Sequence, residues 1–76
     1  MNWQLHIVSD PKVLYGKPVV KNTRIAVDLI LEKLATGDTI QDILDAYPNL
    51  TLEDINACLL FAADSVKNEL INTKAS

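Results

Sequence analysis

The sequence has few of the residues from which small proteins build covalent, catalytic or metal sites. Among 76 residues there is one cysteine, Cys58, and one histidine, His6. A single cysteine excludes an intrachain disulfide, and its position within an apolar helical pattern favours a buried thiol in a reducing compartment. His6 lies near no recognisable nucleophile or acid motif. We therefore expect a protein that is not an enzyme.

Long apolar runs, a signal-peptide pattern and lipidation motifs are also lacking, which favours a cytoplasmic protein with no membrane partner. Apolar residues make up 49% of the chain but only 5% are aromatic, a composition typical of an aliphatic globular domain. A chain of this length buries only about 60 to 65% of its unfolded surface. Its core is thin, and a homodimer would add to it.

No cofactor or metal site is expected. The dipeptide Gly16-Lys17 lacks the earlier glycine and the following hydroxyl residue of a phosphate loop. Five acids gather around the predicted helix starts, where carboxylates favour the positive end of the helix dipole, and we interpret them as solvated. They are Asp38, Asp42, Asp45, Glu53 and Asp54.

The net charge of −3 conceals a strong asymmetry along the chain. Residues 1–24 carry four basic side chains and one acid, a balance of +3, whereas residues 25–76 carry three basic side chains and nine acids, a balance of −6. A phosphate backbone would have to meet the basic front, and a basic protein would be attracted to the acidic rear.

Three helices are predicted in a single domain covering residues 1–76. The first spans 26–36 and ends at Gly37. A helix-turn-helix follows over 39–63, in which Thr39 with Asp42 and Thr51 with Asp54 have the spacing of capping boxes. Pro48 ends its first helix, near residue 46. The last helix continues to about residue 70, and residues 72–76 form a frayed tail.

A short basic β ribbon is predicted over residues 1–24. Trp3, Leu5 and Ile7 alternate with polar residues, as in a strand with one buried face, and Val19-Val20 suits a second strand. Asn22 makes the following corner, because asparagine tolerates a left-handed backbone.

The third helix has a wide apolar arc. Ile55, Leu59, Ala62, Val66 and Leu70 form the stripe expected to face the core. Leu60 and Phe61 lie on a neighbouring flank, and we expect them to bind a partner, which is either a second copy or another protein.

This order of signals resembles the small bacterial proteins known as domain of unknown function 433, over about residues 7–63. The resemblance rests on Ile7, Asp10-Pro11, 16–20, Thr23-Arg24-Ile25, Val27, Gly37, Ile43-Leu44, Tyr47-Pro48, Leu50-Thr51, Asp54-Ile55, Leu59 and Phe61-Ala62. Asn22 and Ala26 stand where that family usually has Gly and Pro. The resemblance implies a mainly α, three-helix domain of the homeodomain-like helix-turn-helix kind with a short N-terminal β ribbon.

The resemblance also implies a function: the antitoxin of a type II toxin–antitoxin pair, which neutralises a PIN-like ribonuclease toxin and often binds its own operator DNA. An acidic surface suits a ribonuclease that is basic around its RNA site. The alternative is a homodimeric structural or DNA-binding regulatory domain without a toxin.

The distribution of charged residues indicates that DNA would bind the ribbon and corner rather than the third helix. If the third helix read DNA, only Asn56 could contact a base, and Glu53 and Asp54 would repel the phosphates. Lys17, Lys21 and Arg24 on the ribbon and corner are the expected phosphate contacts. An ion pair between Arg24 and Asp28 is the competing structural role for that arginine.

Overall fold

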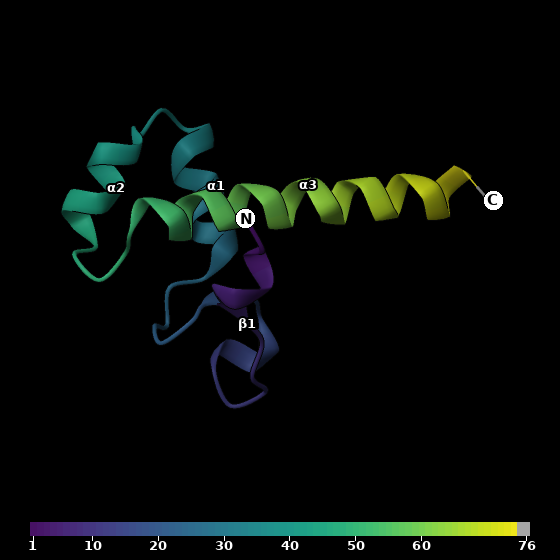
Figure 1. Ribbon diagram of the computed structural model, residues 1–76, viewed down its shortest axis with the longest axis horizontal. Helices are drawn as coiled ribbons and strands as arrows, with labels where there is room; N and C mark the ends of the chain where they lie inside the picture. The colour runs from purple at the N-terminus through teal and green to yellow at the C-terminus, as the bar shows by residue number, and fades with distance from the viewer. Residues whose placement is uncertain (75–76) are drawn as a thin grey trace.

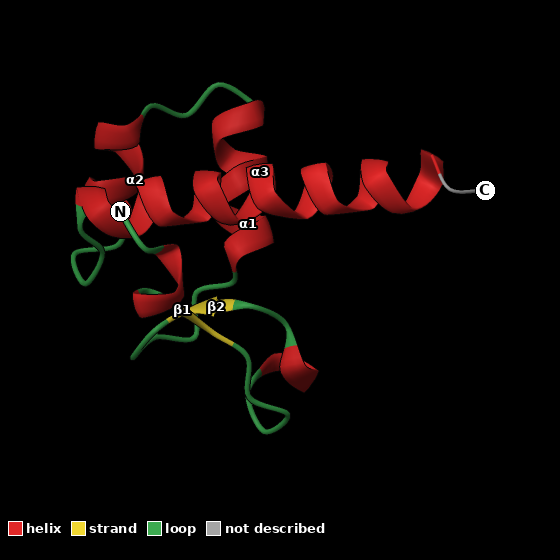
Figure 2. Ribbon diagram, turned by 45° about the vertical axis from the view of Figure 1, so that its right-hand side comes forward, coloured by secondary structure: helices red, strands yellow, loops and turns green. Residues whose placement is uncertain are grey.

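The chain forms three helices and a two-stranded antiparallel sheet, joined by two short 3-10 helices (Figures 1 and 2). The computed structural model describes the backbone of residues 1–74 and the side chains of residues 1–68. In chain order the elements are η1 (Trp3–Leu5), β1 (Ile7–Val8), η2 (Leu14–Gly16), β2 (Val19–Val20), α1 (Val27–Ala35), α2 (Ile40–Ala46) and α3 (Leu52–Lys74).

The ribbon is shorter than its sequence suggests. Ile7 pairs with Val20 and Val8 with Val19, but the alternating segment that precedes Ile7 is not a strand. Its residues form η1, in which Asn2 caps the helix by accepting the N–H of Gln4. The strand prediction for Trp3 and Leu5 is wrong. Apolar residues at alternate positions are typical of a strand, but they also occur in a 3-10 turn that is held in place by the packing of one large side chain.

Trp3 is that large side chain. Its indole ring meets the Phe61 ring edge to face at 4.9 Å, and its N–H donates to the Asp64 carboxylate at 2.6 Å. These contacts attach η1 to the middle of α3, so the N-terminal segment is packed by tertiary contacts rather than by strand pairing.

The corner after β2 has the predicted left-handed residue, with Asn22 at φ 65°. The Thr23 hydroxyl donates to the Val20 carbonyl and accepts the N–H of Ile25. The chain then returns so that Ala26 bridges Val19. This closed turn starts α1 directly beside the sheet.

Helix α1 ends in a Schellman motif. Gly37 has φ 106°, its N–H donates to the Leu34 carbonyl, and the Asp38 N–H donates to the Lys33 carbonyl. The C-terminal cap that the sequence predicted at Gly37 is therefore present.

Both predicted capping boxes are formed. Thr39 and Asp42 exchange hydrogen bonds of 2.9 and 3.0 Å at the start of α2, and Thr51 and Asp54 exchange bonds of 3.0 and 3.2 Å at the start of α3. Helix α2 has the predicted bounds, whereas α3 reaches Lys74. The predicted tail over 72–76 thus falls partly within α3, and residues 75–76 lie outside the described residues.

The core lies where the three helices and the ribbon meet. Its fully buried side chains come from every main element: Val19, Val20, Val27, Ile30, Ile43, Ile55 and Cys58. The buried side of α3 is centred on Cys58, about 100° of rotation from Leu59. Leu59 and Val66, which the sequence placed inward, are instead 44% and 54% exposed. The prediction is confirmed for Ile55, which is fully buried, and Ala62 is half-buried, but it is wrong for Leu59 and Val66. The last member of the stripe, Leu70, lies outside the residues whose side chains are described.

Helix α3 extends beyond the rest of the molecule. In Figure 1 its C-terminal half leaves the other elements and continues alone toward the C-terminus. Within the part of the chain that the structure describes, no helix is both long enough and apolar enough to cross a membrane.

Candidate functional surfaces

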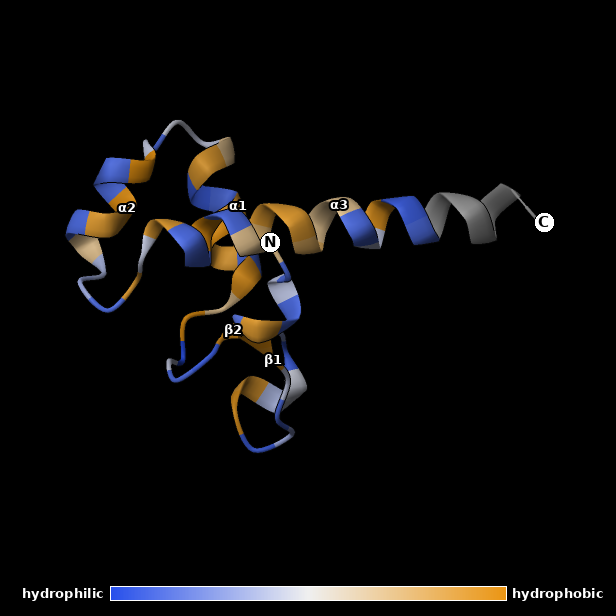
Figure 3. Cartoon of the chain, in the orientation of Figure 1, coloured by the Kyte–Doolittle hydropathy of each residue, from blue (hydrophilic) through white to orange (hydrophobic). Residues whose placement is uncertain are grey.

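The outer face of α3, opposite the core, is largely apolar. Leu52, Leu59, Leu60 and Val66 are 40 to 54% exposed, and the exposed Ala63 lies between them. Hydrophobic residues recur along α3 in the hydropathy colouring, including the part that leaves the body (Figure 3). We call Leu52, Asn56, Leu59, Leu60, Ala63 and Val66 the outer face of α3.

The two predicted partner-binding residues fall on different sides of this helix. Leu60 lies on the outer face and is 40% exposed. Phe61 is half-buried and packs against Trp3 as part of the core. Of the pair, only Leu60 has a surface position suited to binding.

The exposed acids gather at the end of the molecule formed by α2 and the start of α3. Asp42, Asp45 and Glu53 are exposed, and Figure 2 shows this end apart from the β ribbon. The Thr39 N–H, followed by its hydroxyl, holds the pKa of Asp42 below its usual value. Asp45 accepts a hydrogen bond from Gln41, and Asp38 lies 3.9 Å from Lys33. We call Gln41, Asp42 and Asp45 the acidic face of α2.

The basic front is only partly available for a ligand. Lys17 donates to Asp28 at 2.8 Å, with both side chains more than half exposed. This bond raises the pKa of Lys17 and lowers that of Asp28. Lys21 and Arg24 are exposed, and neither forms an ion pair among the described residues. The expected partner of Arg24, Asp28, is bonded to Lys17 instead.

Asn56 is half-exposed on the outer face of α3, one turn beyond the helix start. Glu53 is exposed beside it and Asp54 is bound up in the capping box. A DNA phosphate that approached this turn would be repelled by the negative charge of Glu53. The start of α3 is therefore poorly suited to reading DNA.

Sequence reasoning missed the loop at the tip of the ribbon. Leu14, Tyr15 and Gly16 have φ angles of 49°, 56° and 85°, and Tyr15 is 101% exposed. Three consecutive left-handed residues are costly when two of them carry side chains. The only local signal was Gly16, which marked a turn without indicating how far the left-handed backbone extends.

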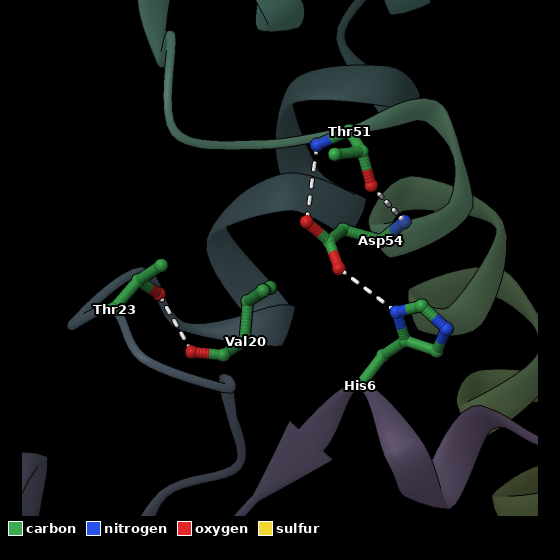
Figure 4. Close-up of polar contacts among 5 residues, drawn as sticks. All are labelled: His6, Val20, Thr23, Thr51 and Asp54. Atoms are coloured by element: carbon green, nitrogen blue, oxygen red, sulfur yellow. Dashed lines mark hydrogen bonds and ion pairs between the residues drawn. The ribbon is translucent and has the colours of Figure 1, made fainter.

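His6 joins the N-terminal segment to α3 (Figure 4). Its Nδ1 lies 2.9 Å from one carboxylate oxygen of Asp54, while the other oxygen accepts the N–H of Thr51. No local sequence pattern indicates this pairing, because His6 and Asp54 are 48 residues apart. With the His6 side chain 28% exposed and its acid already used as a helix cap, the pair is suited to positioning η1 and β1.

Cys58, four residues after Asp54 on α3, is fully buried, as predicted for a core thiol. Burial, and then the negative charge of Asp54, raise its pKa to about 11. A thiol held protonated in this way is a poor nucleophile.

The described residues enclose no pocket and bring together no group of three or more His, Cys, Asp or Glu side chains that could hold a metal ion. The features available for function are therefore three surfaces: the outer face of α3, the acidic face of α2 and the basic front.

The fold defines a small, mainly helical domain of three helices with a short antiparallel β ribbon. Residues 7–62 match the family model described as "Protein of unknown function (DUF433)", and the chain belongs to this family. The match agrees closely with the predicted range of about 7–63.

Two proteins illustrate the relationship. The uncharacterized protein y4eO of Sinorhizobium fredii is 34% identical over 56 residues, which are 74% of this chain but 25% of that protein. The crystal structure of a DUF433 member from Anabaena variabilis superposes with a TM-score of 0.79 at 29% identity, covering 86% of this chain and 64% of that one. The chain thus spans a quarter of the first relative and less than two thirds of the second.

Proposed function

We propose that this chain is a non-enzymatic cytoplasmic binding protein, the antitoxin of a type II pair that neutralises a PIN-like ribonuclease. The observation that carries the proposal is the separation of charge in space: the exposed acids Asp42 and Asp45 on α2 lie away from the basic ribbon. A ribonuclease has to attract RNA phosphates and is therefore basic around its active site. An acidic protein surface is drawn to the same place and competes with RNA for it.

The acidic face of α2 is the surface that we assign to the ribonuclease. Its acids lie along the exposed side of α2, a short helix that is held by a capping box and by the buried Ile43. Pre-ordered charges cost little entropy on binding, so they contribute to affinity as well as to the rate of encounter.

The test is co-expression with the product of the adjacent open reading frame, followed by co-purification and an RNA-cleavage assay. The unmodified chain should form a stable complex and silence cleavage. The variant Gln41→Lys/Asp45→Lys changes the charge of the acidic face from −2 to +1 and should weaken inhibition at least about tenfold at low salt, since close charge pairs across interfaces are worth about 1 kcal/mol or more.

A matched control adds the same three positive charges elsewhere. Gln4, Ser9 and Asn68 are exposed, and their side chains form no hydrogen bond to the described residues. The variant Gln4→Lys/Ser9→Lys/Asn68→Lys should inhibit like the unmodified chain. Equal inhibition by both variants would remove the acidic face from the proposal, and failure of the unmodified chain to bind the ribonuclease would remove the antitoxin function itself.

Operator binding is the second candidate, supported by Lys21 and Arg24, which are exposed and form no ion pair among the described residues. We propose that the homeodomain-like helix-turn-helix formed by α2 and α3 serves as a scaffold here and that the ribbon contacts the phosphates. Reversing the charges of Lys17, Lys21 and Arg24 together should lower operator affinity and flatten its salt dependence by about one unit of slope per lost phosphate contact. If operator affinity and its salt dependence stayed unchanged in this variant, the ribbon would not be the DNA contact, and the remaining alternative would be a homodimeric structural domain that does not bind DNA.

A further inference from the structure

We infer that the outer face of α3 binds a second copy of this chain, with the two α3 helices antiparallel and related by a two-fold axis at Leu60. This inference concerns a surface separate from the acidic face of α2 and stands independently of the antitoxin proposal.

The first argument is the spacing of the exposed residues. Leu52, Asn56, Leu59, Ala63 and Val66 alternate steps of four and three, which is the seam pattern of a two-helix coiled coil. The hydrophobic face that α3 directs into its own core, around Ile55 and Cys58, is a different one. The helix therefore carries a second, largely exposed apolar seam on the side away from its described core contacts.

The second argument is that the residues of α3 after Asp64 whose side chains are described, 65–68, form no side-chain bond to another element. Asp64, which accepts from Trp3, is the last residue along α3 whose side chain bonds to another element within the described part of the chain. The helix continues for ten residues to Lys74, about 15 Å at 1.5 Å per residue. Isolated helices of that length are marginal in water. With the axis at Leu60, the start of the partner's α3 at Leu52 lies opposite residue 68, so the partner helix packs against the first turn of this segment.

The third argument identifies the partner as a second copy. Glu53, Leu60 and Lys67 are spaced seven residues apart, so they lie on one line along the helix beside the seam. All three are exposed. With a two-fold axis at Leu60, this line of residues in one copy runs antiparallel to the same line in the other copy. Glu53 of one copy then lies opposite Lys67 of the other, at both ends of the interface.

This arrangement also explains the residues at the centre. Leu59 and Leu60 supply the apolar contact at the axis, and Ala63 is small enough to allow the helices to approach closely. A parallel pair would instead place Glu53 beside Glu53 and Lys67 beside Lys67. The charges therefore select the antiparallel orientation.

The interface is tested first by sedimentation equilibrium of the purified chain over a dilution series. The unmodified chain should be a dimer that dissociates on dilution. Leu60→Glu should be monomeric with an unchanged circular dichroism spectrum, because Leu60 is 40% exposed in the monomer. The matched control is Leu29→Glu on α1, where the leucine is 37% exposed, and it should dimerise normally.

The orientation is tested by charge reversal and mixing. Glu53→Lys alone gives two lysine pairs across the axis, and Lys67→Glu alone gives two glutamate pairs. Each should raise the dimer dissociation constant about tenfold, because two attractive surface pairs become two repulsive ones. An equimolar mixture of the two variants should form a heterodimer close to the unmodified chain in affinity, since every pair across the axis is attractive again.

The mixing result distinguishes an interface from a loss of monomer stability, which a second destabilised variant would not repair. A chain that stays monomeric at every concentration, a Leu60→Glu variant that remains dimeric, or a mixture that associates no better than its components would each overturn the inference. Normal dimerisation of Gln41→Lys/Asp45→Lys is expected, so failure of ribonuclease inhibition and failure of this dimer are separate results.

Discussion

Replacing Asp54 by alanine tests how the N-terminal segment is attached to the helical body. The Asp54 carboxylate accepts from the Thr51 N–H in the α3 capping box and pairs with His6 at 2.9 Å. Loss of the capping contact costs about 1 kcal/mol. Loss of the bond to a largely shielded imidazole costs about 1 kcal/mol more. The expected total is about 2 kcal/mol, or about 10 °C in Tm for a domain of this size.

The structure supplies its own control for this variant. Asp42 makes the same reciprocal bonds with Thr39 at the start of α2 but has no partner on another element among the described residues. Asp42→Ala should therefore destabilise the protein less than Asp54→Ala. The variants should be compared by urea unfolding near neutral pH, with circular dichroism as the readout.

A double-mutant cycle of His6→Ala and Asp54→Ala isolates the contact between the two side chains. The expected coupling is about 1 kcal/mol, since either single variant already breaks the bond. A coupling near zero, or equal losses in Asp54→Ala and Asp42→Ala, would refute the reasoning that this bond holds the N-terminal segment in place.

Three further predictions follow from pKa shifts and backbone angles. Lys17→Gln should raise the pKa of Asp28 toward its ordinary 3.8, which an NMR titration would measure. In the unmodified chain the ion pair adds stability above pH 3.8, and this stability is lost as the pH falls through the lowered pKa of Asp28; in Lys17→Gln it should be absent. Cys58 should react with thiol reagents at neutral pH only as fast as the protein unfolds, and stability should fall as pH rises from 9 to about 11, because the unfolded thiol ionises first. Asn22 has a left-handed backbone, so Asn22→Ala should lower the free energy of unfolding by about 1 kcal/mol in thermal unfolding, and Asn22→Gly should leave it nearly unchanged. Tyr15 also has a left-handed backbone and its side chain is fully exposed, so Tyr15→Gly should raise the free energy of unfolding by about 1 kcal/mol.

The parts of the fold that the sequence predicted correctly depend on nearby residues. Thr39 with Asp42 and Thr51 with Asp54 are three residues apart, and Gly37 follows its helix directly, so local chemistry alone determines these caps. The segment around Trp3 depends on Phe61 and Asp64, about 60 residues away, and its local pattern therefore suggested a strand where there is a 3-10 helix.

The surfaces were harder to predict for a related reason. The wide apolar arc of α3 allowed two assignments of its inward side, and only the positions of α1, α2 and η1 determine that Cys58 is buried and Leu59 is exposed. Likewise, the pairing of Lys17 rather than Arg24 with Asp28 depends on how the ribbon tip folds back toward α1. Asp54 was correctly recognised as a cap, but its second role with His6 has no local signal.

The bond between Trp3 and Asp64 joins residues 61 positions apart in a chain of 76. During synthesis, the N-terminal segment leaves the ribosome first but has nothing to dock against until α3 has been made. Its folding is therefore delayed by the time needed to translate the rest of the domain, although domains commonly fold from the N-terminus onward. Until then Trp3 is exposed, and the order of synthesis is opposite to the order in which this part of the native structure is completed.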